Sequence, residues 1–315
     1  MRRVSVAVLL VVLAVGCGGC ERDSGQQEAT EDTAPDERRP RVVSSDDLPA
    51  KPRRIVSLAP NVTEILFALG VGGRVVGVTK FCDYPEQASE RPSVGSFSNP
   101  DFESILARKP DLVVGGVSGG SEAIYRRLKE IGVPYLFVRM DTVEETYAGI
   151  GEIGTRLGVA GRAESLTARM RRRMERLERQ WRGEEPPRVL LVYGHEPIVA
   201  AGPGSFGHEL LRRAGGRNVL ESGETRFPRL DVEKVVELDP DYIVDTTMVP
   251  AQKDPEFWSA HRGIEAVERG RVAYLEDPAV LRAGPRLPAA LEMIGEAIHS
   301  DRRAPRESDA AGGRD

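Results

Sequence analysis

Two phenylalanines and two glutamates of this chain recur in one pattern, with one copy in each half. The segment FSNPDFESILARKPDLVV begins at Phe97, and the segment FPRLDVEKVVELDPDYIV begins at Phe227. Phe227 follows Phe97 by 130 residues, and Glu233 follows Glu103 by the same number. Each segment also has a Pro-Asp pair before its last apolar run. The repeat predicts two lobes that present equivalent side chains at equivalent places.

The side chains of this repeat suit two kinds of contact. A glutamate near the start of a short helix is favourable to the helix dipole, and its oxygens can still accept a bidentate guanidinium group. A phenylalanine in a loop offers wide apolar contact with few rotatable bonds, although it can also plug a core. Because both residue types recur at one offset, we favour a shared role at both places over two coincidences.

The sequence lacks the usual patterns of metal ligands and nucleophiles. Its four histidines, at positions 195, 208, 261 and 299, do not have zinc-like spacing, and a dedicated ion site needs three or four converging ligands. Cys82 is the single cysteine inside the predicted globular part, where a cysteine usually packs as a small apolar residue. No GxSxG, HExxH or Walker motif occurs. We therefore expect no metal site, no cofactor and no catalytic residue.

Length and composition indicate a soluble globular protein with room for two lobes. The chain has 315 residues, of which 40% are hydrophobic and 30% charged. Its net charge of −5 provides no general basic surface, so nucleic acid is not an expected partner. Only 5% of the residues are aromatic, which makes each ring near a candidate site more informative.

The N-terminus is typical of an exported lipoprotein. MRRVSVAVLLVVLAVGC, residues 1–17, has two arginines and then an apolar run too short to remain as a membrane span. Its end resembles a bacterial lipobox, with Cys17 as the lipidated residue and Cys20 as the alternative. An ordinary secretory signal is the other possibility. We expect an exported protein, anchored in the membrane through its N-terminal lipid and facing the periplasm or the outside of the cell.

The remaining chain alternates short apolar runs with helical patterns. Continuous apolar strands separated by helices are typical of parallel sheets covered on both faces. The sequence predicts an α/β fold with two Rossmann-like lobes, which are joined by a single long helix and enclose a ligand cleft. The expected parts after the signal peptide are a disordered tether at 18–51, an N-terminal lobe at 52–141, a connecting helical segment at 142–185, a C-terminal lobe at 186–300 and a disordered tail at 301–315.

Several segments of the predicted lobes resemble a known family. RRIVSLAPNVTEILFALGVGGRVVGVTKFCDYPEQ, PSVGSFSNPDFESILARKPDLVV and AGPRLPAAL occur in this order between about residues 53 and 300. Together they resemble the periplasmic cobalamin (vitamin B12)-binding proteins of ABC importers. These proteins belong to the helical-backbone class of substrate-binding proteins, which also contains siderophore, haem and metal-ion receptors.

The resemblance implies a partner for the two repeated glutamates. In that family a glutamate on the outer face of each lobe docks onto arginines of a dimeric permease, which works with ATPase subunits. Glu103 and Glu233 match these positions. Exposed ion pairs contribute only about 0–1 kcal/mol each, so they would set register and orientation more than affinity. We expect the binding protein itself to be a monomer.

The resemblance also implies a set of ligand-binding residues. Aromatic rings that flank the corrinoid fall at Phe81, Phe97 and Phe227, and a ligand-contacting arginine falls at Arg282. The other positions in the predicted cleft are Pro60 and Asn61 at the end of the first strand and Tyr193, His195 and Glu196 at the matching strand of the second lobe, with Asp277 near Arg282.

Three functions are compatible with these observations. The first is capture of cobalamin or another corrinoid as the transported ligand. The second keeps the importer but changes the ligand to a ferric siderophore or haem, and an anionic siderophore would use the cationic candidates Lys80, Arg226, Arg229 and Arg282. The third is an exported enzyme, which the missing motifs make the least favoured.

Overall fold

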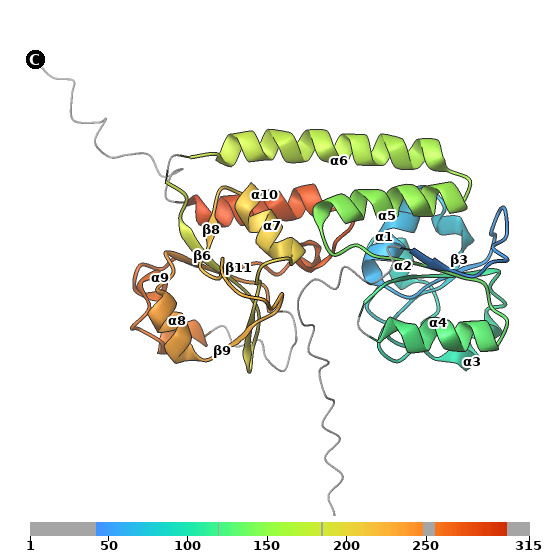
Figure 1. Ribbon diagram of the computed structural model, residues 1–315, viewed down its shortest axis with the longest axis horizontal. Coiled ribbons are helices and arrows are strands. Elements are labelled where there is room, and N and C mark those ends of the chain that lie inside the picture. Colours follow the sequence, from blue (N-terminus) through green and yellow to red (C-terminus); the bar gives the residue numbers. More distant parts are fainter. Residues whose placement is uncertain (1–41, 119, 184, 248–255, 301–315) are drawn as a thin grey trace, which may run out of the picture. The chain divides into compact units, whose positions relative to one another are not determined.

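Short runs of aliphatic residues form parallel strands in two sheets, one in each lobe (Figure 1). The computed structural model describes residues 42–118, 120–183, 185–247 and 256–300. The described residues belong to one compact unit. The predicted signal peptide, Cys17, Cys20, the first part of the predicted tether and the predicted tail lie outside the described residues.

The sheet of the N-terminal lobe has the strand order β1-β5-β4-β2-β3. Strands β2 to β5 are parallel where they pair, and successive residues face opposite cores. Ile55 and Leu112 pack in one core, whereas Val56 and Val113 pack in the other. The strands are β1 (Val42–Ser44), β2 (Ile55–Ser57), β3 (Val75–Gly77), β4 (Leu112–Gly116) and β5 (Tyr135–Val138).

Strand β1 corrects the predicted end of the tether. Val42–Ser44 pairs antiparallel with β5, and the backbone N–H of Ser45 donates to the carbonyl of Tyr135. The ordered lobe therefore begins at least ten residues before the predicted boundary at residue 52. Three residues next to a polar, acidic segment carry too weak a pattern to predict a strand, and pairing with the edge of β5 supplies their hydrogen bonds.

The sheet of the C-terminal lobe has the strand order β11-β10-β6-β7-β9, with β8 also paired to β6. Strands β6, β8, β10 and β11 pair in parallel, whereas β7 is antiparallel to β6 and to β9. The predicted α/β class is confirmed, but both sheets are mixed. In the N-terminal lobe the added edge strand β1 is antiparallel to β5. In the C-terminal lobe two residues join β6 to β7, and so short a turn can connect only antiparallel strands. The strands are β6 (Arg188–His195), β7 (Ile198–Ala200), β8 (Arg217–Asn218), β9 (Arg229–Leu230), β10 (Tyr242–Asp245) and β11 (Val272–Tyr274).

Helices cover both sheets, and Asp101, Ser205 and Asp231 cap three of them by accepting backbone N–H groups. In the described part of the chain, no helix is both long and apolar enough to cross a bilayer. The α-helices of the two lobes are α1 (Pro60–Ala68), α2 (Glu86–Ser89), α3 (Phe102–Ala107), α4 (Ser121–Glu130), α7 (Phe206–Arg213), α8 (Val232–Leu238), α9 (Glu265–Glu268) and α10 (Leu287–Ile298), with 3₁₀ turns η1 (Gly72–Arg74), η2 (Trp258–Ala260) and η3 (Pro278–Leu281).

The connecting segment contains two helices, of which the second is the predicted long helix. Helix α5 (Val143–Arg156) precedes the long helix α6 (Ala160–Trp181), and Gly158 between them adopts a positive φ of 73°. Helix α6 packs on α5 and α10. Its buried residues, such as Met170 and Leu177, join a core that also holds Ile65 of the N-terminal lobe and Leu291 of the C-terminal lobe. The helical connection therefore shares one apolar core with both lobes.

Gly295 makes the close packing of α6 and α10 possible. A Cβ atom at this residue would lie 2.3 Å from Nε1 of Trp181. Gly295→Ala should lower the free energy of unfolding by about 1–3 kcal/mol, because the ring must move or leave its place. Gly151 of α5 is the control: the described residues leave open space at its Cβ, so Gly151→Ala should stabilise the helix by up to about 1 kcal/mol. Urea unfolding measures both, and equal effects would contradict this packing.

Candidate functional site

A pocket of about 480 Å³ lies at the carboxyl ends of the parallel strands of the N-terminal lobe. Ala59–Asn61 follow β2, Gly116–Ser118 end and follow β4, and Val138, Met140 and Asp141 end and follow β5. Ligands of open α/β sheets bind at this edge because the loops there converge and helices begin. The fold therefore positions the N-terminal half of the pocket through its strand order.

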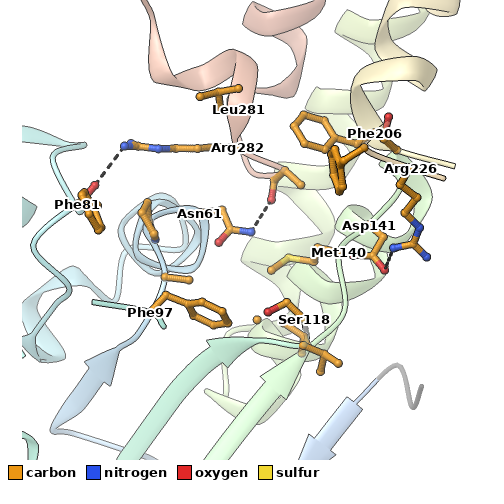
Figure 2. A pocket seen from close by; sticks show the side chains of 18 of the residues that line it. Asn61, Phe81, Phe97, Ser118, Met140, Asp141, Phe206, Arg226, Leu281 and Arg282 are labelled. Atoms are coloured by element: carbon orange, nitrogen blue, oxygen red, sulfur yellow. Dashed lines mark hydrogen bonds and ion pairs between the residues drawn. The ribbon is translucent and has the colours of Figure 1, made fainter. Parts of the chain in front are cut away.

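The C-terminal lobe supplies the other wall of the pocket (Figure 2). Gly204–Phe206 lead into helix α7, Arg226 and Phe227 precede β9, and Leu281–Ala283 end and follow η3. The two walls touch where the Asn61 side-chain amide donates to the carbonyl of Ala283 at 3.1 Å. Segments more than 200 residues apart thus form one lining.

Phenylalanine rings from both lobes line this pocket. Phe81 is 55% exposed, whereas Phe97 and Phe227 are half-buried. Phe206 also lines the pocket, and the sequence analysis did not single it out. A phenylalanine one residue after a helix-capping serine is the signal that could have identified it. All three predicted phenylalanines are therefore lining residues, together with the predicted Pro60, Asn61 and Arg282.

Tyr193 does not line the pocket but supports it from behind. Its ring packs edge-on against Phe227, with 5.7 Å between the ring centroids. Burial raises the pKa of the Tyr193 hydroxyl well above its usual value. Strand β6 places this ring against Phe227, so Tyr193 is not a lining residue and touches the site through Phe227. Its predicted contact with the ligand stays a prediction.

His195 also lies away from the pocket lining, contrary to the prediction. Its Nε2 is 2.6 Å from Oδ2 of Asp245 on the neighbouring strand β10, and its ring stacks on Phe257 at 4.2 Å. The indole Nε1 of Trp258 donates to the same carboxylate at 2.6 Å. Burial of an aspartate requires such donors, so this cluster is explained by the packing of the C-terminal lobe. Glu196 and Asp277 are likewise not lining residues.

Arg282 lines the pocket with its guanidinium group already bound. It donates to Glu64 at 3.0 Å, to Asp83 at 2.5 and 3.1 Å, and to the carbonyl of Phe81 at 3.1 Å. Burial alone would raise the pKa of Asp83, but the hydrogen bonds and charge of Arg282 hold that pKa below its ordinary value. Arg282 thus fixes the loop that carries the exposed ring of Phe81 (Figure 2).

Asp141 of the N-terminal wall and Arg226 of the C-terminal wall form an ion pair, which the sequence analysis did not predict. The Arg226 guanidinium donates to Asp141 at 2.9 Å, and both side chains are largely buried (Figure 2). Burial raises the pKa of Asp141 although the charge of Arg226 opposes this shift. Residues 85 positions apart carry no joint sequence signal, and only the fold brings them together.

The repeated glutamates occupy equivalent and exposed places. Glu103 in α3 and Glu233 in α8 are each the second residue of a helix capped by an aspartate. Each helix ends next to a non-glycine residue with positive φ, Lys109 at 47° and Asp239 at 43°. The repeat seen in the sequence is therefore a repeat in structure, and neither glutamate lines the pocket.

The two repeated helices are also tied to their sheets in the same way. Arg54 donates to the carbonyl of Arg108 after α3, and Arg188 donates to the carbonyl of Leu238 at the end of α8. Asp111 and Asp241 accept the backbone N–H groups that open β2 and β6. Equal anchoring holds both helices rigidly at equivalent positions of the two lobes.

The lining of the pocket offers broad apolar contact and a few polar groups. Its lining combines aromatic rings, aliphatic groups and two arginines that are paired with carboxylates. Across the described ranges, no three His, Cys, Asp or Glu side chains are grouped so that they could hold a metal ion. Such a surface can bind a broad, partly apolar molecule through shape and a few polar contacts.

Comparison with known proteins agrees with this geometry. The chain is 31% identical, over 93% of its length and 95% of the relative's, to an uncharacterized ABC transporter substrate-binding lipoprotein, YvrC, of Bacillus subtilis. The crystal structure of the periplasmic vitamin B12-binding protein BtuF of Vibrio cholerae aligns with a TM-score of 0.70 and 26% identity, over 81% of this chain and all of that one.

A haem-binding protein is equally similar in structure. The periplasmic haem-binding protein RhuT of Roseiflexus sp. RS-1 aligns with a TM-score of 0.71 and 27% identity, over 79% of this chain and 98% of that one. The family described as periplasmic binding protein matches residues 55–279, which include every strand of the two sheets except β1. The resemblance noted in the sequence is thereby confirmed, and the chain belongs to the periplasmic binding protein family.

Proposed function

We propose that this chain is the extracytoplasmic substrate-binding lipoprotein of an ABC importer and that it captures cobalamin or a related corrinoid. One observation carries the proposal: Phe81 and Phe97 of one lobe and Phe227 of the other line a single open pocket. A flat macrocycle needs broad apolar contact on its faces and edges, and rings on facing loops supply it at small entropic cost. The ligand is carried unchanged, so no catalytic turnover is expected.

The charges in the pocket favour a corrinoid over an anionic ligand. Haem has two propionates, and many ferric siderophores are anionic, so both need free cationic partners. The lining arginines Arg226 and Arg282 already bind Asp141 and Asp83. Arg226 keeps one buried donor, Nε, without a partner among the described residues. A single donor of this kind suits a neutral amide carbonyl, and amides are the side groups of a corrinoid.

The lining offers few of the side chains that usually bind haem iron, and haem is the second candidate ligand. Haem iron in proteins is usually held by His, Cys, Met or Tyr. Among the described lining residues, Met140 alone belongs to this set. The predicted His195 and Tyr193 are directed elsewhere. The similarity to a haem-binding protein and the presence of Met140 keep haem as the alternative ligand, and a ferric siderophore remains the third.

Delivery to the importer follows from the repeated glutamates. We infer that Glu103 and Glu233 dock onto arginines of a permease dimer, which works with its ATPase subunits. Both carboxylates are exposed and are held at equivalent helix starts. The lipid on Cys17 would keep the protein near that partner and raise its local concentration.

Calorimetric titration tests the choice of ligand. The chain without residues 1–20 would be titrated with cyanocobalamin, haemin and a ferric hydroxamate siderophore. We expect tight one-to-one binding of cyanocobalamin and at least about 100-fold weaker binding of the other two. The propionates of haemin would meet lining arginines that already bind carboxylates. A ferric hydroxamate complex is neutral but lacks the wide flat faces that the rings of both lobes can contact. Tight haemin binding with no heat from cyanocobalamin would move the chain to the second candidate.

A further inference from the structure

Leu106 and Val236 are large apolar side chains that the fold leaves in solvent. Leu106 is 46% exposed and Val236 is 42% exposed. Within the described ranges, the other exposed large apolar residues are Phe81, Tyr84 and Tyr274. Isolated apolar residues on a surface need no explanation. Leu106 and Val236, however, are separated by the same 130 residues that separate Glu103 from Glu233.

The helices α3 and α8 show that these exposures are not packing defects. Each helix buries the preceding residue, Ile105 or Val235, completely in the core of its lobe. The next residue then points away from that core. It lies three positions after the glutamate, so the carboxylate and the apolar side chain share one helix face. Each lobe therefore presents a paired acidic and apolar contact, which we call the docking pair.

The two docking pairs are held alike and lie on one side of the described unit. Figure 1 shows α3 and α8 at the edge opposite helix α6. Both helices are fixed in the same way: each has an aspartate cap, a residue with positive φ after its end, and an arginine that donates to a carbonyl at its end. A surface that carries the same contact twice fits a partner that presents one site twice, which is what a dimer of identical subunits does.

We infer that Leu106 and Val236 are the apolar anchors of this docking surface, each inserting into an apolar depression beside the arginine that pairs with Glu103 or Glu233. The inference rests on the proposed function, because the partner is the membrane-embedded permease dimer of the importer. Exposed ion pairs contribute little affinity. A well-packed apolar residue that excludes water around a charged contact contributes much more affinity. The two apolar anchors therefore supply most of the binding free energy, and the glutamates set the position of the binding protein on its partner.

Uptake by cells tests the anchors. The full chain would replace the native copy in cells of its own source, and uptake of labelled cyanocobalamin would be measured below saturation. The double variant Leu106→Ser, Val236→Ser should reduce uptake by about tenfold or more while leaving the Kd for the ligand unchanged. Tyr274→Ser is the matched control, because Tyr274 is also 42% exposed but belongs to β11. Wild-type uptake by the double variant would overturn the inference.

Photocrosslinking tests the partner without depending on the ligand. Benzoylphenylalanine would be placed at Leu106 in one full-length variant and at Val236 in another, and crosslinked products from cell membranes would be identified by mass spectrometry. Both variants should crosslink to the same integral membrane polypeptide, through the same peptide of it. Two different polypeptides, or no membrane product from either variant, would overturn the inference.

The two experiments separate this inference from the ligand assignment. If the wild-type chain binds none of the three titrated ligands, the proposed ligand fails, yet the crosslinks still report on the docking surface. If the wild-type chain binds and imports cobalamin but the double serine variant behaves like it, the ligand assignment holds and the apolar anchors are disproved.

Discussion

Replacing both Phe97 and Phe227 by alanine is expected to weaken the binding of cyanocobalamin by about two to four orders of magnitude. Burial of one phenylalanine side chain contributes about 1.5–3 kcal/mol, and each tenfold loss of affinity corresponds to about 1.4 kcal/mol. The two rings come from different lobes and line the same pocket. Each single variant should therefore lose about one to two orders of magnitude, and the two losses should roughly add.

The controls for this prediction separate affinity from folding. Phe227 packs on Tyr193, so its loss also removes a contact within the lobe. Thermal unfolding of each variant without ligand measures that effect separately. Tyr274→Ala removes an exposed ring outside the pocket and should leave the Kd unchanged. Wild-type affinity in a folded double variant would show that the ligand binds elsewhere.

Glu64→Ala should lower the free energy of unfolding by about 3–5 kcal/mol. The Glu64 side chain is 1% exposed and accepts from Arg282 at 3.0 Å and from Arg286 at 3.0 and 2.7 Å. Its removal leaves two largely buried guanidinium groups without the carboxylate between them. Glu64 lies on α1 and both arginines lie near α10, so the cost also appears as weaker attachment of the C-terminal segment to the N-terminal lobe.

Glu152→Ala is the comparison for this variant. Glu152 pairs with Arg156 at 2.7 Å on the partly exposed face of α5, and such pairs contribute about 1 kcal/mol or less. Urea unfolding of both variants measures the difference directly. Glu64→Ala could lower the free energy of unfolding no more than Glu152→Ala does. The arginines would then have found other partners or water, and the buried network would not hold the lobes together.

The local sequence predicted the elements of this fold where one physical signal was sufficient. Apolar runs such as LVV after Pro110-Asp111 predicted buried parallel strands, because only a doubly covered strand is apolar on both faces. Residues 257–270 carry a helical pattern, but they do not form one continuous helix. They form the 3₁₀ turn η2 and then α9, since the backbone of His261 leaves the helical region at ψ 64° before Gly263.

The sequence correctly predicted those lining residues that lie at the end of a strand or belong to the repeat. Pro60 and Asn61 line the pocket because a parallel strand ends there and a helix begins. Phe97 and Phe227 line it from both sides because the repeat is structural. His195 also follows a strand pattern, but its orientation depends on Asp245, a strand neighbour that the linear pattern does not show.

The sequence by itself therefore determined the fold class, the two-lobed repeat and most of the aromatic lining, because each depends on residue type and spacing along the chain. It also predicts an exported N-terminus. The tertiary structure alone decided which charges are free. Arg282 meets Asp83 across 199 residues and Glu64 across 218, so it is bound rather than available. The tertiary structure also decided that Leu106 and Val236 face solvent. Which face of a helix is buried depends on the sheet against which the helix packs.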